Sequence, residues 1–250
     1  IFSIMISLNK NLGFMQGRLS PIIDDMIQRF PYDDWNSELI LAKNNNWNLM
    51  EWTIDYFTFE KNPILDDSFD NIKFEGIKID SITADFFMQD PFFLHESKEK
   101  INSLILDFKK VINSMIKLKI KYIVLPLVDN ASLTQNKVDE DHVIEKLSLI
   151  FNEFKKDNIE FIFESDYKPK KLLKFIEKFN SKKVGINYDS GNSASLGFKC
   201  EEEIFTYGQW IKNCHLKDRV FGGATVKFGE GNTDFQKVLR CLNDIKYDGN

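Results

Sequence analysis

Histidine and cysteine are both scarce in this chain of 250 residues, and their scarcity limits the sites that it can build. Cys200, Cys214 and Cys241 form no Cys-x-x-Cys pair and are odd in number, which favours reduced thiols in a cytosolic protein. The three histidines are too few for a trinuclear zinc cluster.

The sequence also lacks long hydrophobic runs and blocks of one charge. Its apolar stretches fall well short of the roughly 20 residues that a membrane span needs. Residues 1–6 are apolar but have neither a basic segment before them nor a small-residue cleavage site, so we expect no signal peptide. The net charge of −5 comes from interspersed acidic and basic residues, which argues against a nucleic-acid surface. We therefore expect a cytoplasmic protein without membrane or nucleic-acid partners.

No Pro/Gly/Ser-rich linker divides the chain, and no Gly-x-Gly-x-x-Gly motif is present. The missing motif disfavours an open nucleotide-binding sheet, which would show a glycine-rich first turn. The 43% of hydrophobic residues, with 23 Phe and 4 Trp among the aromatic ones, can fill a large aromatic core. These features predict one domain over residues 1–250.

Strand-like runs alternate with helix-like segments along the whole chain. Apolar, β-branched or aromatic runs predict strands near 12–16, 47–52, 79–84, 121–126, 159–164, 183–189 and 210–215. Apolar residues three and four apart predict helices over 34–45, 97–118, 143–154, 170–179 and 234–242. Seven successive strand–helix units predict an α/β protein with the (β/α)8 fold of a TIM barrel.

The number of strands is one short of that fold. The turn at residues 246–250 resembles the lead-in to an eighth strand. A barrel without its last strand would keep two open edges. We expect the eighth strand to follow Asn250, and a natural seven-stranded barrel is the alternative.

Three potential metal ligands stand at the ends of three consecutive predicted strands. Glu164, Asp189 and His215 follow one another at intervals of 25 and 26 residues, about one strand–helix unit each. The ends of parallel strands lie on one face of the sheet, so these side chains should converge. Two carboxylates and one imidazole favour Mn²⁺, Mg²⁺ or Co²⁺ over a structural zinc, although a Zn²⁺ ion can also use them. The alternatives are a helix cap or salt bridge for Glu164, a turn for Asp189 and a core hydrogen bond for His215.

Other polar residues follow the predicted strands and could contact a substrate. Cations suited to a phosphate, carboxylate or enediolate oxygen occur after the first and seventh strands, although each could instead be a surface cation paired with Asp24 or Asp218. Carboxylates near the ends of the second and third strands could bind sugar hydroxyls, and a histidine after the third could line the pocket. These candidates are Arg18, Lys217, Arg219, Glu51, Asp85 and His95.

Several short motifs resemble the sugar phosphate isomerase/epimerase family, the xylose isomerase-like TIM barrels. The most specific of them is Met-Gln-Gly-Arg-Leu-Ser-Pro at residues 15–21, which is typical of one branch of the family. Shorter ones are Glu-Trp at 51–52, Phe-Glu at 163–164, Asp-Ser-Gly-Asn at 189–192 and His-Leu-Lys-Asp at 215–218. The resemblance extends over the whole chain.

The resemblance implies a ligand set and substrate contacts. In the family's ketose epimerases, one divalent ion is held by residues at the positions of Glu164, Asp189 and His215, and by a glutamate of strand eight. That glutamate would lie beyond Asn250. The family often has a substrate-contacting histidine where this chain has Asn192, and Arg219 corresponds to a family arginine. Family members are commonly dimers or tetramers, which implies a homo-oligomer.

Together these features predict a metal-dependent isomerase or epimerase that acts on a small sugar or sugar phosphate. The ion would act on the substrate carbonyl, and Glu164 would transfer a proton next to it through an enediolate. Isomerisation is favoured over epimerisation, because the second acid/base of an epimerase is the family's strand-eight glutamate. A metal-dependent lyase or hydrolase on the same barrel and a sugar-binding barrel without turnover are the alternatives.

Overall fold

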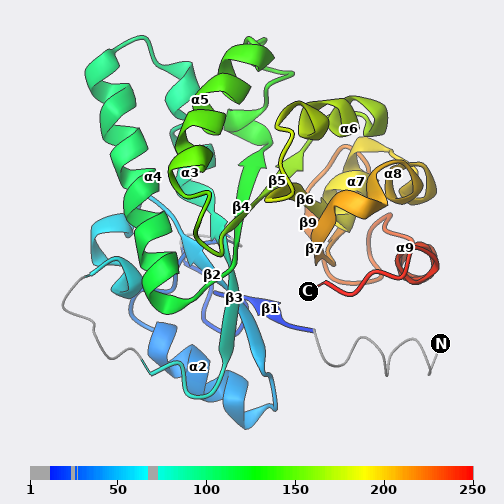
Figure 1. The fold of residues 1–250 in the computed structure, drawn as a ribbon. Helices are drawn as coiled ribbons and strands as arrows, with labels where there is room; N and C mark the ends of the chain where they lie inside the picture. The colour runs from blue at the N-terminus through cyan, green and yellow to red at the C-terminus, as the bar shows by residue number, and fades with distance from the viewer. Residues whose placement is uncertain (1–11, 24–25, 27, 67–72, 250) are drawn as a thin grey trace. The chain divides into compact units, whose positions relative to one another are not determined.

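The computed structural model describes residues 12–23, 26, 28–66 and 73–249. Figure 1 shows that helices alternate with strands along this part of the chain. The strands of the main sheet lie side by side in the order in which they occur in the sequence. Sequential parallel strands joined by helices are the topology of a (β/α) barrel, as predicted.

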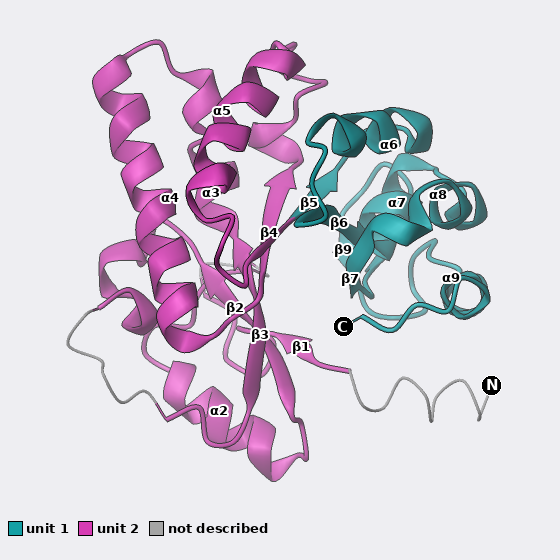
Figure 2. Cartoon of the chain, viewed as in Figure 1, with its two compact units in different colours: residues 1–11, 162–250 teal, residues 12–161 magenta. Residues whose placement is uncertain are grey.

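Contacts divide the chain into two compact units, which Figure 2 colours separately. Unit 2 covers residues 12–161, and the described part of unit 1 covers residues 162–249. Each unit is described by itself below. The predicted single domain over residues 1–250 stays a prediction.

The described part of unit 2 contains the first strands of the sheet, which are parallel, and the helices that follow them. Its strands pair β1 with β2, β2 with β3 and β3 with β4. The elements are β1 (Phe14–Met15), α2 (Trp35–Asn44), β2 (Leu49–Ile54), β3 (Lys78–Ala84), α3 (Asp85–Gln89), α4 (Lys98–Leu118), β4 (Tyr122–Leu127) and α5 (Glu140–Glu153).

Unit 1 carries the later strands. Strand β5 (Glu160–Ser165) enters it at residue 162, and β6 (Val184–Asp189) pairs in parallel with β7 (Ile211–His215). Its helices are α6 (Pro169–Lys178), α7 (Ser190–Leu196), α8 (Cys200–Tyr207) and α9 (Phe235–Asp244). The short strands β8 (Asp218–Arg219) and β9 (Thr225–Val226) form a separate antiparallel ribbon.

The core is aromatic, as the composition predicts. In unit 2, Trp52 lies 5.5 Å from Phe30 and 6.0 Å from Trp35 between ring centroids, and its indole nitrogen donates to the buried Asn62 at 3.1 Å. In unit 1, Phe163 packs against Phe175 with ring centroids 5.3 Å apart. Such rings fill the interior of each unit and hold its strands in place.

Some sequence predictions concern residues that the structure does not describe. The expected absence of a signal peptide falls on residues 1–6, and Asp24, a suggested partner of the cations, also lies outside the described residues. The predicted eighth strand would follow Asn250, beyond the described range. Within that range, no helix has both the length and the apolar character to cross a membrane.

Candidate metal centre

The three predicted ligands converge in unit 1. One ligand atom each from Glu164, Asp189 and His215 lies within 4.8 Å of the others. His215 Nδ1 is 3.3 Å from Glu164 Oε2 and 3.9 Å from Asp189 Oδ2. Asp189 and His215 are also aligned partners in the β6–β7 ladder. The parallel register therefore brings together residues that are one strand–helix unit apart in sequence.

Asp189 begins helix α7 rather than a tight turn. Its Oδ1 accepts a hydrogen bond of 2.7 Å from the backbone N–H of Asn192, which makes Asp189 the N-cap of this helix. Its Oδ2 lies 3.3 Å from Lys217 Nζ and faces His215. One carboxylate therefore serves both the helix and the centre.

Two asparagines form a chain of hydrogen bonds to the candidate ligands. The Asn187 amide donates to Glu164 Oε2 at 2.7 Å and lies 3.0 Å from His215 Nδ1. Asn213 in turn donates to Asn187 Oδ1 at 2.9 Å. Residues behind the ligands that hold them in orientation are typical of metal sites.

Asn192 links Glu164 to the basic residues after β7. Its amide nitrogen donates to Glu164 Oε1 at 2.5 Å. Its amide oxygen accepts from Arg219 Nη1 at 2.6 Å and from Lys217 Nζ at 3.4 Å. The guanidinium of Arg219 is further fixed by Gly223, whose carbonyl oxygen accepts from Nε at 3.1 Å and from Nη2 at 2.8 Å.

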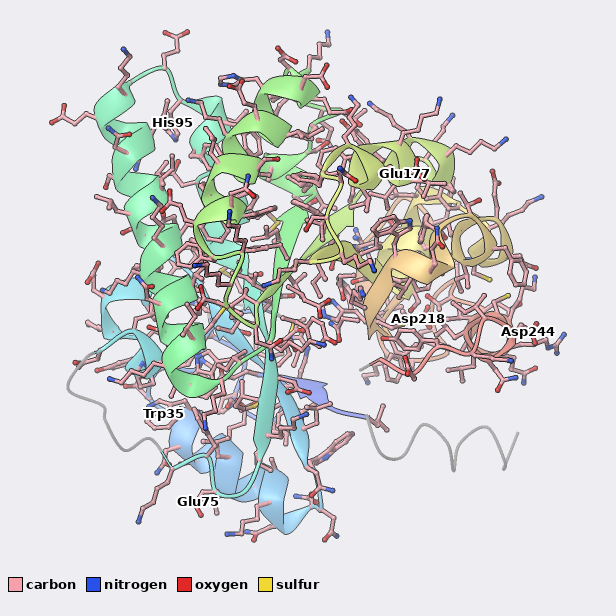
Figure 3. The ribbon with its side chains drawn as sticks, in the orientation of Figure 1. Trp35, Glu75, His95, Glu177, Asp218 and Asp244 are labelled. Atoms are coloured by element: carbon pink, nitrogen blue, oxygen red, sulfur yellow. The ribbon has the colours of Figure 1, made fainter. Side chains whose placement is uncertain are left out.

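Asp218 holds the segment that carries these cations. Its buried carboxylate accepts backbone hydrogen bonds from Gly229, Gly231 and Thr233 at 2.8, 3.0 and 3.1 Å. Burial raises the pKa of Asp218, but the three N–H groups outweigh it and hold the pKa below its ordinary value. Figure 3 labels this residue. The Asp218 carboxylate is thus bonded to the backbone, and Arg219 bonds Asn192 and Gly223.

The pKa values of Glu164 and Asp189 are shifted in opposite directions. Burial raises the pKa of Glu164, but the hydrogen bond and charge of His215, with Lys217 and Asn187, lower it below its ordinary value. Burial and the negative charge of Glu164 together raise the pKa of Asp189. Two carboxylates that compete for one buried space suit a divalent cation, which would neutralise both.

A small polar cavity of about 20 Å³ lies beside the ligands and has room for one water molecule. Glu164, Asp189, Tyr188 and Glu203 are among the residues that line it. Glu203 accepts hydrogen bonds from the hydroxyls of Ser193 and, at 3.1 Å, Tyr207. The Tyr188 hydroxyl is buried without a hydrogen-bond partner among the described residues.

The other predicted substrate contacts belong to unit 2. Glu51 is buried inside β2 rather than at its end, because this strand runs to Ile54, two residues further than predicted. Asp85 is buried directly after β3, and Gln28 donates to both of its oxygens at 2.7 and 2.9 Å. His95, labelled in Figure 3, lies 2.5 Å from Asp90 through Nε2. Arg18 donates to the Met15 sulfur at 3.6 Å. Their roles as substrate contacts stay predictions, as do those of the unit 1 candidates.

Buried Glu38 fixes the backbone of the Met-Gln-Gly-Arg-Leu-Ser-Pro motif. This glutamate of α2 accepts hydrogen bonds from the backbone N–H of Gly17 and of Leu19, each at 2.9 Å. Gly17 has φ +89°, and a β-carbon there would lie 2.8 Å from the Arg29 carbonyl oxygen. The motif therefore builds a turn that depends on glycine and on a buried carboxylate.

The sequence interpretation missed the residues that support the centre. Asn187 and Asn213 each precede a ligand by two positions, so strand alternation places them on the ligand's face of the sheet. That spacing could have identified them. Nothing in the local pattern around Glu203 indicates its burial, because it follows two other glutamates at a helix start.

Comparisons with known proteins agree with this fold. The model of the xylose isomerase-like TIM barrel family matches residues 48–250. The chain belongs to this family. Over 84 residues it is 34% identical to the uncharacterized protein MJ1311 of Methanocaldococcus jannaschii, a match that covers 32% of this chain and 29% of that relative.

Two solved structures that share this fold contain a bound sugar or a bound metal. The D-psicose 3-epimerase of Clostridium cellulolyticum H10, solved with D-tagatose, has a TM-score of 0.69 at 12% identity. The match covers 95% of this chain and 83% of the epimerase chain. The IOLI protein, solved with a bound zinc atom, has a TM-score of 0.67 at 17% identity and covers 94% and 85%. At these identities the likeness concerns the fold.

Proposed function

We propose that this member of the family is a divalent-metal-dependent isomerase or epimerase of a small sugar or sugar phosphate. The convergence of Glu164, Asp189 and His215 within 4.8 Å carries the proposal. Two carboxylates and an imidazole, supported from behind by Asn187, are a donor set that Mn²⁺, Mg²⁺, Co²⁺ or Zn²⁺ can use. The neighbours described as an epimerase and a zinc-bound protein support it by analogy of fold.

Each side chain has a role that follows from its contacts. When bound, the ion supplies a Lewis acid that polarises a substrate carbonyl. Glu164, whose pKa lies below its ordinary value, is ionised at neutral pH and can take a proton from the carbon beside that carbonyl. Asn192 orients Oε1 of this base, and Lys217 and Arg219 supply positive charge beside the developing enediolate.

The proposal includes the surroundings in which the enzyme works. The thiols of Cys200, Cys214 and Cys241 are all free, which fits a reducing cytoplasm. We propose that it acts there, in carbohydrate metabolism, as a homo-oligomer. Sedimentation of the purified protein tests the oligomeric state.

Metal content tests the site directly. After loading with Mn²⁺ and desalting, mass spectrometry should find about one ion per chain in the wild type and none in His215→Ala. His142→Ala is the matched control, because His142 is exposed on α5 and should leave the content unchanged. Equal retention by both variants would refute the centre. If the wild type also retains no Mn²⁺, the measurement is repeated on a chain extended past residue 250. Failure of that longer chain to bind Mn²⁺ would also refute the metal centre.

Proton exchange tests the reaction. In D2O, a panel of aldoses, ketoses and their phosphates should show deuterium entering the carbon next to the carbonyl, followed by the isomer or epimer. Glu164→Gln should abolish the exchange, whereas the exposed Glu177→Gln should not. Release of water from the sugar without isomer formation would instead identify a lyase. Sugar binding without any exchange would identify a binding protein.

A further inference from the structure

A second pocket, of about 560 Å³, lies within unit 2 and has no part in the proposed reaction. It is lined by Tyr56 and Phe57 after β2, Gln89 and Asp90 at the end of α3, Lys100 and Asp107 of α4, and Asn130 after β4. We call it the Tyr56 pocket. Its volume is that of a small-molecule site, and three successive strand-end loops contribute to it.

The polar groups of the Tyr56 pocket are held rigidly. Gln89 Oε1 accepts from the Tyr56 backbone N–H at 2.7 Å, and the Tyr56 hydroxyl donates to Asp107 Oδ2 at 3.1 Å. The Asn130 amide donates to the carbonyl oxygens of Met88 and Gln89 at 3.2 and 3.0 Å. Each side chain is therefore fixed through one of its polar atoms, which orders it before any ligand arrives.

The second polar atom of each side chain remains available. Among the described residues, none bonds the Gln89 amide nitrogen, the Asn130 amide oxygen or Asp107 Oδ1. One N–H donor and two oxygen acceptors in a pocket match the hydroxyl groups of a polyol, which both donate and accept.

An aromatic ring stands at the rim beside these polar groups. Phe57 is 58% exposed, and the guanidinium of Arg29 lies 4.5 Å from its ring centroid. An exposed ring next to fixed hydrogen-bonding groups offers an apolar surface for the C–H face of a sugar.

The charges disfavour an anionic ligand. Lys100 is the only cation that lines the pocket among the described residues, and its Nζ lies 2.7 Å from Asp90 Oδ2. Asp107 adds a further carboxylate. The lining cation is therefore already paired, and the Arg29 guanidinium at the rim lies over the Phe57 ring, so the lining itself offers a phosphate or carboxylate no uncompensated positive charge.

We infer that the Tyr56 pocket binds a neutral sugar ring of the hexopyranose class, with Phe57 stacked on its apolar face and Gln89, Asp107 and Asn130 bonded to its hydroxyls. The inference stands apart from the proposed function, because it uses no residue of the metal centre. It therefore survives or fails separately from the isomerase proposal.

Ligand-observed NMR on the whole chain tests this inference. Methyl glucopyranosides, galactopyranosides and mannopyranosides are titrated without added metal, beside inorganic phosphate and tetramethylammonium. At least one glycoside should bind with a millimolar dissociation constant, and the two ions should bind more weakly. Phe57→Ala and Asp107→Ala should each weaken that glycoside by about tenfold or more.

Two control variants locate the binding. Phe205→Ala removes a ring of α8 that is 59% exposed, and Glu164→Gln alters the metal centre, so both should retain the wild-type affinity. Asp107→Ala removes the hydrogen bond from Tyr56 and could unfold the protein. Phe57→Ala should still fold, because Phe57 is exposed, and it therefore keeps the test decisive. No glycoside binding, tighter binding of either ion, or loss in Glu164→Gln but not in Phe57→Ala would each overturn the inference.

Discussion

The amide nitrogen of Asn192 donates to Oε1 of Glu164 at 2.5 Å, and this bond fixes the orientation of the proposed catalytic base. The same amide accepts from Arg219 at its oxygen. Asn192→Leu, which keeps the size of the side chain, should remove the hydrogen bonds to Glu164 Oε1 and from Arg219 Nη1 and lower the free energy of unfolding by about 1–3 kcal/mol. Urea denaturation measures the loss.

Asn152→Leu is the control for this change, because Asn152 is exposed on α5. It should alter the free energy of unfolding by less than about 0.5 kcal/mol. Equal losses in the two variants would mean that the Asn192 bridge contributes nothing specific.

Glu203 should make stability depend on pH. Burial raises its pKa from an ordinary value of 4.5 to about 7, although Ser193 and Tyr207 bond its carboxyl group. The native state therefore binds more protons than the unfolded state between these values, so this contribution is full below pH 4.5 and is lost as the pH rises to about 7. The loss amounts to about 3 kcal/mol at most.

Denaturation of Glu203→Gln and of its exposed neighbour Glu202→Gln across this pH range checks the sign. Glu203→Gln should flatten the decline in stability seen in the wild type, whereas Glu202→Gln should reproduce it. A wild-type profile unchanged by Glu203→Gln would show that this carboxyl group is not the source.

The Asp218 carboxylate should stabilise the backbone conformation of residues 219–233. Asp218→Asn replaces a carboxylate that accepts three backbone hydrogen bonds with a weaker neutral acceptor. The amides of Gly229, Gly231 and Thr233 should exchange with solvent about tenfold faster or more. Hydrogen exchange by NMR measures these rates. Asp244→Asn is the control, because Asp244 is exposed, and it should leave these rates unchanged. Unchanged rates in Asp218→Asn would show that the carboxylate does not protect these amides.

Glu38 should have a comparable effect on the turn of the first motif. Glu38→Ala removes the acceptor of the Gly17 and Leu19 amides, which should then exchange about tenfold faster or more. Exchange after the surface substitution Glu177→Ala provides the reference. Full protection of both amides in Glu38→Ala would show that the turn stands without this carboxylate.

The strands and long helices were predictable because their patterns are local. Helix α4 was predicted over 97–118 and occupies Lys98–Leu118, since its apolar residues recur at helical spacing. The predicted first strand, 12–16, shrinks to Phe14–Met15. The short helices α3, α7 and α8 were not predicted, because a run of five to eight residues carries too little periodicity.

The candidate ligands were predictable because parallel strands bring their ends together, whatever lies between them. Their supports were harder to find. Asn187 occupies a strand in which an asparagine looks like an interruption, and its value comes from contacts with two other strands. Asn192 resembles a turn residue in sequence, yet it lies in the first turn of α7. The two-residue spacing places Asn187 on the face of Asp189, but the groups that it bonds are set by the tertiary structure.

Asp189 takes part both in the start of a helix and in the candidate metal centre. Its Oδ1 caps α7, and its Oδ2 faces His215 and Lys217. A glutamate at this position would reach one methylene further and could not keep both atoms in place. Adjusting the ligand would therefore also shift the helix that carries Asn192. Directed evolution of the proposed metal centre should thus change its preference among ions through Glu164 or His215 more readily than through residue 189.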